Sequence, residues 1–165
     1  MSVPRDSVPR DRGAGRADCL RAAEPSDAEA IAALQRASFD DPWSAASVRR
    51  LLTGPANLSL VAERVGLAGF LVGQCVADTA EVLAVAVDGR RRRAGWGDAL
   101  LAGFEAVAAA AGAERVLLDV AADNAPAEAL YRSRGYETVA RRDRYYAAGR
   151  PAPVDALVMV KMLAD

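Results

Sequence analysis

The chain has no histidine, two cysteines and a single lysine among its 165 residues. Without histidine, neither a Ser-His nor a Cys-His catalytic pair is available. Cys19 and Cys75 lie too far apart in the sequence for a CxxC redox pair, and no histidine completes a metal-binding motif with them. We therefore expect a protein that holds no metal and resides in a reducing cytoplasm.

Long hydrophobic runs are also missing. Every apolar stretch is broken by charge or glycine well short of the ~20 residues that a membrane-spanning helix requires. The opening segment is polar and contains no apolar core of a signal peptide. We therefore expect no association with a membrane.

An excess of one charge sign is absent as well, because 21 basic residues face 22 acidic ones. Such a balance argues against bulk nucleic-acid binding, although arginines gather at 90–93 and 141–144. Apolar residues make up 52% of the chain, which suffices for the core of one domain. Residues 1–17 contain Ser-Val-Pro-Arg-Asp twice and no apolar periodicity, which predicts a disordered tail before a domain over 18–165.

Within that domain, hydrophobic periodicity predicts strands alternating with helices. The spacing of Ser26 and Glu29 predicts a capping box at the first helix. The almost continuous apolar run 115–120 is typical of a strand covered on both faces. The pattern as a whole predicts a single α/β domain, a mixed central sheet flanked by helices. Strands are expected over 19–23, 58–63, 66–76, 81–87, 115–120, 136–142 and 157–163, and helices over 26–38, 44–52, 96–111 and 124–135.

The stretch 83–131 carries the clearest functional pattern. An apolar strand leads into Arg92-Arg93-Ala94-Gly95-Trp96-Gly97, and a helix follows at once. The free N–H groups and the positive dipole end of that helix favour phosphate oxygens, which two glycines let approach. A Rossmann motif needs a third glycine where Leu100 stands, and the Gly-Lys-Ser/Thr of a Walker motif is absent. The pattern predicts a phosphorylated cofactor; a solvated basic turn before an ordinary helix is the alternative.

Three polar residues further along could take part in catalysis. Asp119 interrupts an apolar strand, so burial should raise its pKa and make it a base, unless it merely pairs with an arginine. Asn124 and Tyr131 lie two turns apart on one helix face. Asn124 is by default the N-cap of that helix, and Tyr131 is either a proton donor or a packed core tyrosine.

These spacings resemble a known family. Arg-x-x-Gly-x-Gly between a strand and a helix resembles the acyl-CoA-binding motif of the GCN5-related N-acetyltransferases (GNAT). The run from Asp119 through Asn124 and Tyr131 to Gly135-Tyr136 resembles the Glu-Val-x-x-x-Asn…Leu-Tyr-x-x-x-Gly-Phe run of the RimI branch. Members of that branch acetylate the N-terminal alanine of a small-subunit ribosomal protein. The resemblance covers nearly everything after the tail, with further matches at Asp41-Pro42-Trp43, the strand 81–87, Arg144-Tyr145-Tyr146, Gly149-Arg150 and 155–159.

The resemblance implies the single-domain GNAT fold, acetyl-CoA as co-substrate and a role for each matching residue. Tyr131 would protonate the leaving thiolate, and Asp119, which replaces the family's glutamate, would serve as base directly or through water. Asp98 replaces a family arginine, so its charge opposes a phosphate, and the arginines at 90–92 could compensate. The cofactor would contact Val85, Ala86, Val87, Arg92, Arg93, Ala94, Gly95, Trp96, Gly97, Asp98 and Asn124, and the acceptor would contact Trp43, Tyr145 and Tyr146.

The implied activity is acetyl transfer from acetyl-CoA to the N-terminal alanine of a protein, with a ribosomal protein as the implied partner. A lysine or small-amine acetyltransferase remains an alternative, as does a non-catalytic acyl-CoA-binding module in which Asp119 and Asp98 mark lost catalysis. The base could also be Glu81 or a chain of waters. Trp43 could instead anchor the core, and Tyr145 and Tyr146 could form a merely exposed aromatic pair.

Overall fold

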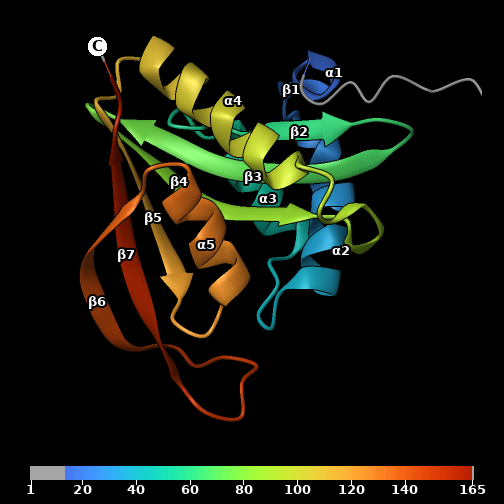
Figure 1. Ribbon diagram of the computed structural model, residues 1–165. Coiled ribbons are helices and arrows are strands. Elements are labelled where there is room, and N and C mark those ends of the chain that lie inside the picture. Colours follow the sequence, from blue (N-terminus) through green and yellow to red (C-terminus); the bar gives the residue numbers. More distant parts are fainter. Residues whose placement is uncertain (1–13, 165) are drawn as a thin grey trace, which may run out of the picture.

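A computed structural model describes residues 14–164 as one seven-stranded sheet with helices on both faces (Figure 1). The strand order is β1-β2-β3-β4-β5-β7-β6, and the sheet is mixed because β4 and β5 pair in parallel while the other neighbours pair antiparallel. The predicted α/β fold is confirmed. The strands are β1 (Leu20–Ala22), β2 (Leu60–Glu63), β3 (Leu67–Val76), β4 (Thr79–Val87), β5 (Arg115–Ala121), β6 (Glu137–Tyr146) and β7 (Val154–Met162).

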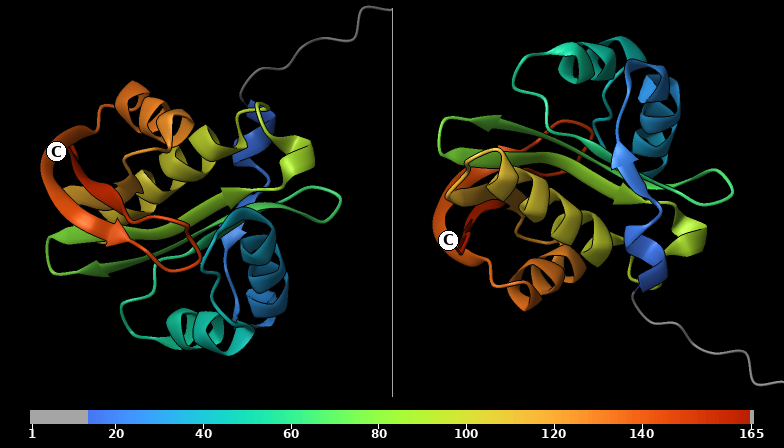
Figure 2. Two further views of the ribbon diagram at one scale, coloured as in Figure 1. Left: turned by 90° about the horizontal axis from the view of Figure 1, so that it is seen from below. Right: turned by 90° about the horizontal axis from the view of Figure 1, so that it is seen from above.

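Helices α2 and α3 cover one face of the sheet, and α4 and α5 cover the other (Figure 2). The first thirteen residues of the predicted tail lie outside the described residues. Its last four residues, Ala14–Ala17, form the short helix α1. The helices are α1 (Ala14–Ala17), α2 (Ala28–Ser38), α3 (Ala45–Thr53), α4 (Trp96–Ala110) and α5 (Ala125–Ser133), with 3₁₀ turns η1 (Pro25–Asp27) and η2 (Gly89–Arg91). Within residues 14–164, no helix is both long and apolar enough to cross a membrane.

Each face of the sheet has its own apolar core. On the α4 side, the predicted stripe of α4 is buried at Leu100, Leu101 and Phe104. Gly73 of β3 lies directly beneath the Phe104 ring, where a Cβ would overlap it, so the helix packs closely on the sheet. On the other side, Ile31 of α2 packs with buried residues of α3 and β3. Two cores on opposite faces hold the sheet between two helical layers.

The predicted capping box at Ser26 and Glu29 is wrong. The carboxylate of Asp27 accepts a hydrogen bond of 2.7 Å from the backbone N–H of Glu24, and its oxygens also accept from Arg21. This network closes the 3₁₀ turn η1, and α2 begins only after it. The capping box thus lies at Glu24 and Asp27, two residues earlier than the local pattern indicated, and Arg21 of β1 binds its acidic member.

The prediction that β5 is covered on both faces is also wrong. Val116, Leu118 and Val120 are buried under α4 and α5, but the alternate residues, Leu117 and Asp119, are only half-buried. The helical layer of α2 and α3 does not extend over this part of the sheet (Figure 2). One face of β5 is therefore open to a ligand.

Strands β4 and β5 separate halfway along their length (Figure 1). Their parallel ladder ends at the pair Val82 and Leu118, although β4 continues to Val87 and β5 to Ala121. The register against β3 shifts at the same point, because Leu83 is an extra residue in β4, and such a bulge bends a strand. The backbone of 83–87 thus has no ladder partner on its β5 side, and the opening lies at the carboxyl ends of two parallel strands, a preferred place for ligands.

Candidate active site

A cavity of about 620 Å³ lies where the two strands separate. Its walls come from β4, β5, α5, the C-terminal part of α2 with the loop between α2 and α3, and the hairpin of β6 and β7. Ala86, Val87 and the loop 92–98 lie outside this cavity. The cavity brings together seven of the predicted site residues, namely Trp43, Val85, Asp119, Asn124, Tyr131, Tyr145 and Tyr146.

Asp119 projects from β5 into the cavity with 19% of its side chain exposed. Its Oδ1 is buried and has no hydrogen-bond partner within residues 14–164. Burial raises the pKa of Asp119, as predicted; the charge of Arg142 opposes this effect, and the charge of Glu81 adds to it. The nearest cation is Arg142, whose Nε lies 3.6 Å from Oδ1. Asp119 therefore combines both features considered from the sequence, a carboxylate made more basic by burial and an arginine at its side.

Tyr131 projects from α5 toward the same cavity and is 7% exposed. Burial raises the pKa of Tyr131 to about 12, so the hydroxyl stays protonated at neutral pH and is able to donate. Its ring meets Tyr136 edge-on at 5.9 Å between centroids, which fixes the ring plane. The N-cap role predicted for Asn124 is confirmed, since its side chain accepts from the N–H of Ala127 at 3.3 Å.

The aromatic residues predicted to contact the acceptor line the cavity. Tyr145 and Tyr146 end strand β6, where the sequence placed a loop, and their rings meet edge-on at 5.1 Å. Arg142 stacks over Tyr145 at 5.4 Å, and Arg150 stacks over Tyr146 at 5.7 Å. Trp43 both lines the cavity and packs against the core on the α2 side, so the two alternatives for it are not exclusive.

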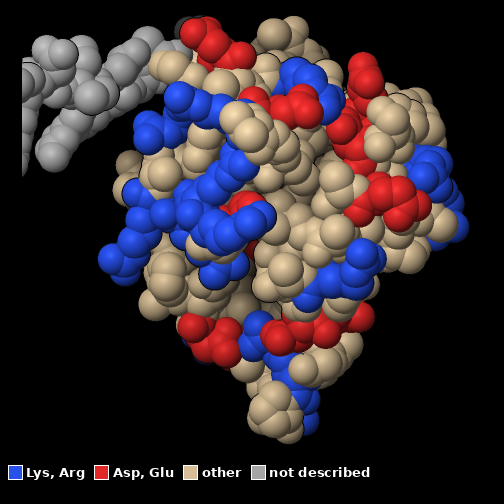
Figure 3. Space-filling view, turned by 90° about the vertical axis from the view of Figure 1, so that its right-hand side faces the viewer, with Lys and Arg blue, Asp and Glu red and all other residues tan. Residues whose placement is uncertain are grey.

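The glycine-bearing loop lies at the N-terminus of α4. Gly95 is the N-cap with φ +83°, a conformation that favours glycine, and no side chain caps the helix. The N–H groups of the first helical turn therefore remain available for an anion. Gly97 also lets α5 pack closely against α4, because a Cβ there would lie 3.1 Å from the Leu130 side chain of α5. Basic side chains gather on the face of the molecule that carries this loop (Figure 3).

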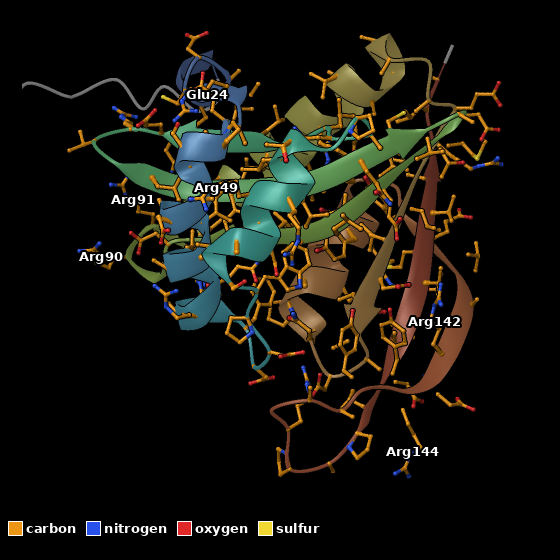
Figure 4. The ribbon with its side chains drawn as sticks, turned by 180° about the vertical axis from the view of Figure 1, so that it is seen from behind. Glu24, Arg49, Arg90, Arg91, Arg142 and Arg144 are labelled. Carbon is orange, nitrogen blue, oxygen red and sulfur yellow. The ribbon has the colours of Figure 1, made fainter. Side chains whose placement is uncertain are left out.

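The four consecutive arginines at 90–93 differ in their contacts within the protein. Arg90 pairs with Asp88 at 3.2 Å, and Arg91 donates to the carbonyls of Arg64 and Val65 in the β2–β3 turn (Figure 4). Within residues 14–164, Arg92 and Arg93 form no ion pair, so their charges remain available for a phosphorylated ligand.

The negative charge of Asp98 is paired with an arginine at the end of α5. Arg134, at the C-terminal end of α5, lies 2.9 Å from its carboxylate and also binds Glu105 at 2.7 Å. The suggested compensation by the arginines at 90–92 stays a prediction: Arg90 and Arg91 bind groups of the protein, and Arg92 keeps its charge available for a phosphate. The backbone N–H of Asp98 remains part of the uncapped first turn of α4.

Arg16 is a residue that sequence reasoning missed. It belongs to α1, and its guanidinium lies 5.8 Å from the centroid of the Trp96 ring. Its Nη1 would lie 3.5 Å from a Cβ built on Gly95, which puts a positive charge beside the loop. No local pattern distinguishes this arginine from the others in the N-terminal segment, because the contact depends on how α1 packs against α4.

Comparison with known proteins identifies the class. The chain matches the model of the acetyltransferase (GNAT) family over residues 28–136, and it belongs to that family. The N-alpha-acetyltransferase RimI of Mycobacterium tuberculosis is 37% identical over 147 residues, which cover 85% of this chain and 89% of that protein. The ribosomal-protein-S18-alanine N-acetyltransferase of Escherichia coli superposes with a TM-score of 0.82 at 28% identity, over 88% of this chain and 94% of that structure.

An uncharacterized protein of Mycobacterium leprae is also 37% identical, over 131 residues. These residues cover 75% of this chain but only 36% of that relative, which is therefore much longer. Within the family, the chain is RimI-like in sequence and in fold.

Proposed function

We propose that this acetyltransferase transfers an acetyl group from acetyl-CoA to the N-terminal α-amine of a protein that begins with alanine. Transfer is direct, within a ternary complex, and takes place in the cytoplasm. The observation that carries the proposal is the cavity between the separated strands, into which Asp119 and Tyr131 both project. The names of the RimI-like relatives support an N-terminal amine as acceptor and make a small-subunit ribosomal protein the first candidate.

The residues present suit acetyl-CoA. The uncapped N-terminus of α4, with Arg92, Arg93 and Arg16 nearby, offers N–H groups and positive charge to the pyrophosphate. The unpaired backbone of 85–87 on β4 offers hydrogen bonds to the amides of the pantetheine arm. The thioester would then reach the cavity where the two strands separate.

The proposed chemistry assigns one proton to each of two side chains. The amine nitrogen attacks the thioester carbonyl and loses a proton to Asp119, directly or through water. The C–S bond breaks, and the sulfur takes a proton from the hydroxyl of Tyr131. An α-amine has a pKa of about 7.7–8.0, against about 10.4 for lysine, so a carboxylate suffices as base for an α-amine more readily than for lysine.

Thiol release from acetyl-CoA tests the proposal with three acceptors. These are a peptide beginning Ala-Arg, the same peptide with a blocked N-terminus and an internal lysine, and a polyamine. We expect turnover on the free alanine peptide alone. Turnover only on lysine or the polyamine would overturn the N-terminal assignment in favour of a lysine or small-amine acetyltransferase. Binding of acetyl-CoA without any turnover would favour a non-catalytic acyl-CoA-binding module.

A further inference from the structure

Three loops that surround the cavity meet at one side chain, Arg150. Arg150 belongs to the loop between β6 and β7. Its Nε lies 3.2 Å from a carboxylate oxygen of Asp40, in the loop between α2 and α3, and its Nη1 lies 2.9 Å from Asp123, in the loop between β5 and α5. The guanidinium thus joins three segments that are distant in the sequence.

The backbone and the neighbouring ring strengthen this junction. A Cβ on Gly149 would overlap the carbonyl oxygen of Asp40, so the β6–β7 loop lies directly on the α2–α3 loop. The φ of +70° at Gly149 also favours glycine at this point. The guanidinium of Arg150 stacks over the ring of Tyr146, and only 21% of its side chain is exposed. The planar guanidinium of Arg150 is therefore held by carboxylates at two of its edges and by the Tyr146 ring on one face.

The junction belongs to the acceptor side of the site. Asp40, Tyr146 and Arg150 line the cavity that contains Asp119 and Tyr131. Asp123 directly precedes the N-cap of α5, the helix that carries Tyr131. None of the loop residues 92–98 lines this cavity or pairs with Arg150.

We propose that Arg150 is a positioning residue that holds these three loops as one wall of the acceptor site. It then acts mainly on the affinity for the acceptor and much less on the affinity for acetyl-CoA. This inference rests on the proposed function in so far as an amine-bearing peptide occupies the cavity. Lysine replaces arginine poorly here, because a single ammonium group cannot reproduce two directed bonds from separate nitrogens together with the stacked planar face.

The test compares Arg150→Gln, Arg150→Lys and the matched control Arg144→Gln. Arg144 lies on the same hairpin, its side chain forms no ion pair within residues 14–164, and it points away from the protein (Figure 4). For Arg150→Gln we expect the peptide KM to rise about tenfold with kcat within about twofold, and for Arg150→Lys a partial recovery of KM. The dissociation constant for acetyl-CoA should rise much less than the peptide KM in the two Arg150 variants, and it should stay at the wild-type value in Arg144→Gln.

Amide hydrogen exchange provides a readout that needs no acceptor. In Arg150→Gln, exchange should accelerate together at 39–41, 122–124 and 147–153, while Arg144→Gln matches the wild type. Unchanged exchange in all three segments would overturn the proposal, as would an equal loss of affinity for acetyl-CoA and peptide. If the wild-type protein turns over no alanine peptide, that result counts against the proposed function alone, and the exchange data still decide whether Arg150 joins the loops.

Discussion

Asp119 Oδ1 and Arg142 Nε lie 3.6 Å apart, close enough for their charges to interact but too far for a hydrogen bond. Arg142 reaches Asp119 from β6 across β7, the strand between them. The buried carboxylate therefore has a counter-charge at its side while its oxygen stays free to accept a proton. This arrangement leads to the first prediction.

Replacing Arg142 by glutamine should move the acid limb of the pH profile of kcat/KM to higher pH. Burial raises the pKa of Asp119, the Arg142 charge lowers it and the Glu81 charge raises it, so removing Arg142 raises it further. Tyr146 and Tyr131, which also line the cavity, stay protonated and neutral across this range. The measurement is the pH profile on an alanine peptide; a shift to lower pH would contradict the assignment of Asp119 as base.

Asp119→Asn should lower kcat by about 10²-fold, the lower end of the range for loss of a general base. The deficit should shrink at pH 9, where more of the α-amine is already deprotonated. Stability should not fall, because the pKa of Asp119 is raised in the folded state. Asp119 contributes to the free energy of unfolding below its pKa in the unfolded state, and this contribution is lost as pH rises through its pKa in the folded state. Asparagine does not ionise and therefore avoids the loss. Urea unfolding at pH 5 and pH 8 compares the two proteins, and marked destabilisation of the variant at pH 8 would contradict this account.

Tyr131→Phe should reduce kcat by about tenfold to a hundredfold, because a thiolate of pKa near 8.5 leaves without much help. The fold should persist, since the edge contact with Tyr136 depends on the ring and not on the hydroxyl. The wild type should show no alkaline limb from this residue below about pH 11, because burial raises its pKa to about 12. Steady-state kinetics from pH 6 to 10, with circular dichroism as the control for folding, check both statements.

Arg16→Ala should raise the dissociation constant of acetyl-CoA about three- to tenfold, because the guanidinium stands beside Gly95 at the uncapped end of α4. The effect should diminish at 0.5 M salt, where charges are screened within a few ångströms. Arg16→Lys keeps the positive charge, so it should lose less affinity for acetyl-CoA than Arg16→Ala. Equal affinities for the wild type and Arg16→Ala at low salt would show that this arginine only packs against Trp96.

Arg134→Ala should destabilise the protein by about 2 kcal/mol, because it leaves the buried carboxylate of Glu105 with Lys161 as its remaining partner. Although burial works against ionisation, the hydrogen bonds from Arg134 and Lys161 lower the pKa of Glu105. This stabilisation is present above the pKa of Glu105 in the unfolded state and is lost as pH falls through its pKa in the folded state. The difference in unfolding free energy between the wild type and Arg134→Ala should therefore narrow toward pH 3.

Arg132→Ala is the control on the same helix. Its exposed pair with Glu128 at i, i+4 should contribute less than about 1 kcal/mol. Urea unfolding measures the free energy of unfolding of both variants. Equal losses in the two variants would mean that the burial of Glu105 does not determine how much its ion pair stabilises the protein.

Local patterns were enough to predict most of the elements. The 3.6-residue stripe of α4, with Gly112 after it, and the hairpin of β2 and β3 follow from contacts among residues near in sequence. The loop Gly95–Gly97 is likewise a local feature, since its geometry depends on one strand end and one helix start. Asn124 and Tyr131 could be paired from the sequence because seven residues span two turns of one helix, whereas the roles of residues such as Val85 and Tyr145 came from the family resemblance.

The tertiary structure alone decided which side chains meet across elements. The separation of β4 and β5 results from a bulge that no residue type in β4 marks, and it leaves one face of β5 open where the apolar run indicated cover. Three contacts join residues that are 27 to 110 positions apart in the sequence. They are the ion pair of Asp98 with Arg134, the packing of Arg16 on Trp96, and the junction at Arg150. Such contacts depend on how whole elements pack, because charge and burial act through space, whereas periodicity and spacing describe only the path of the chain.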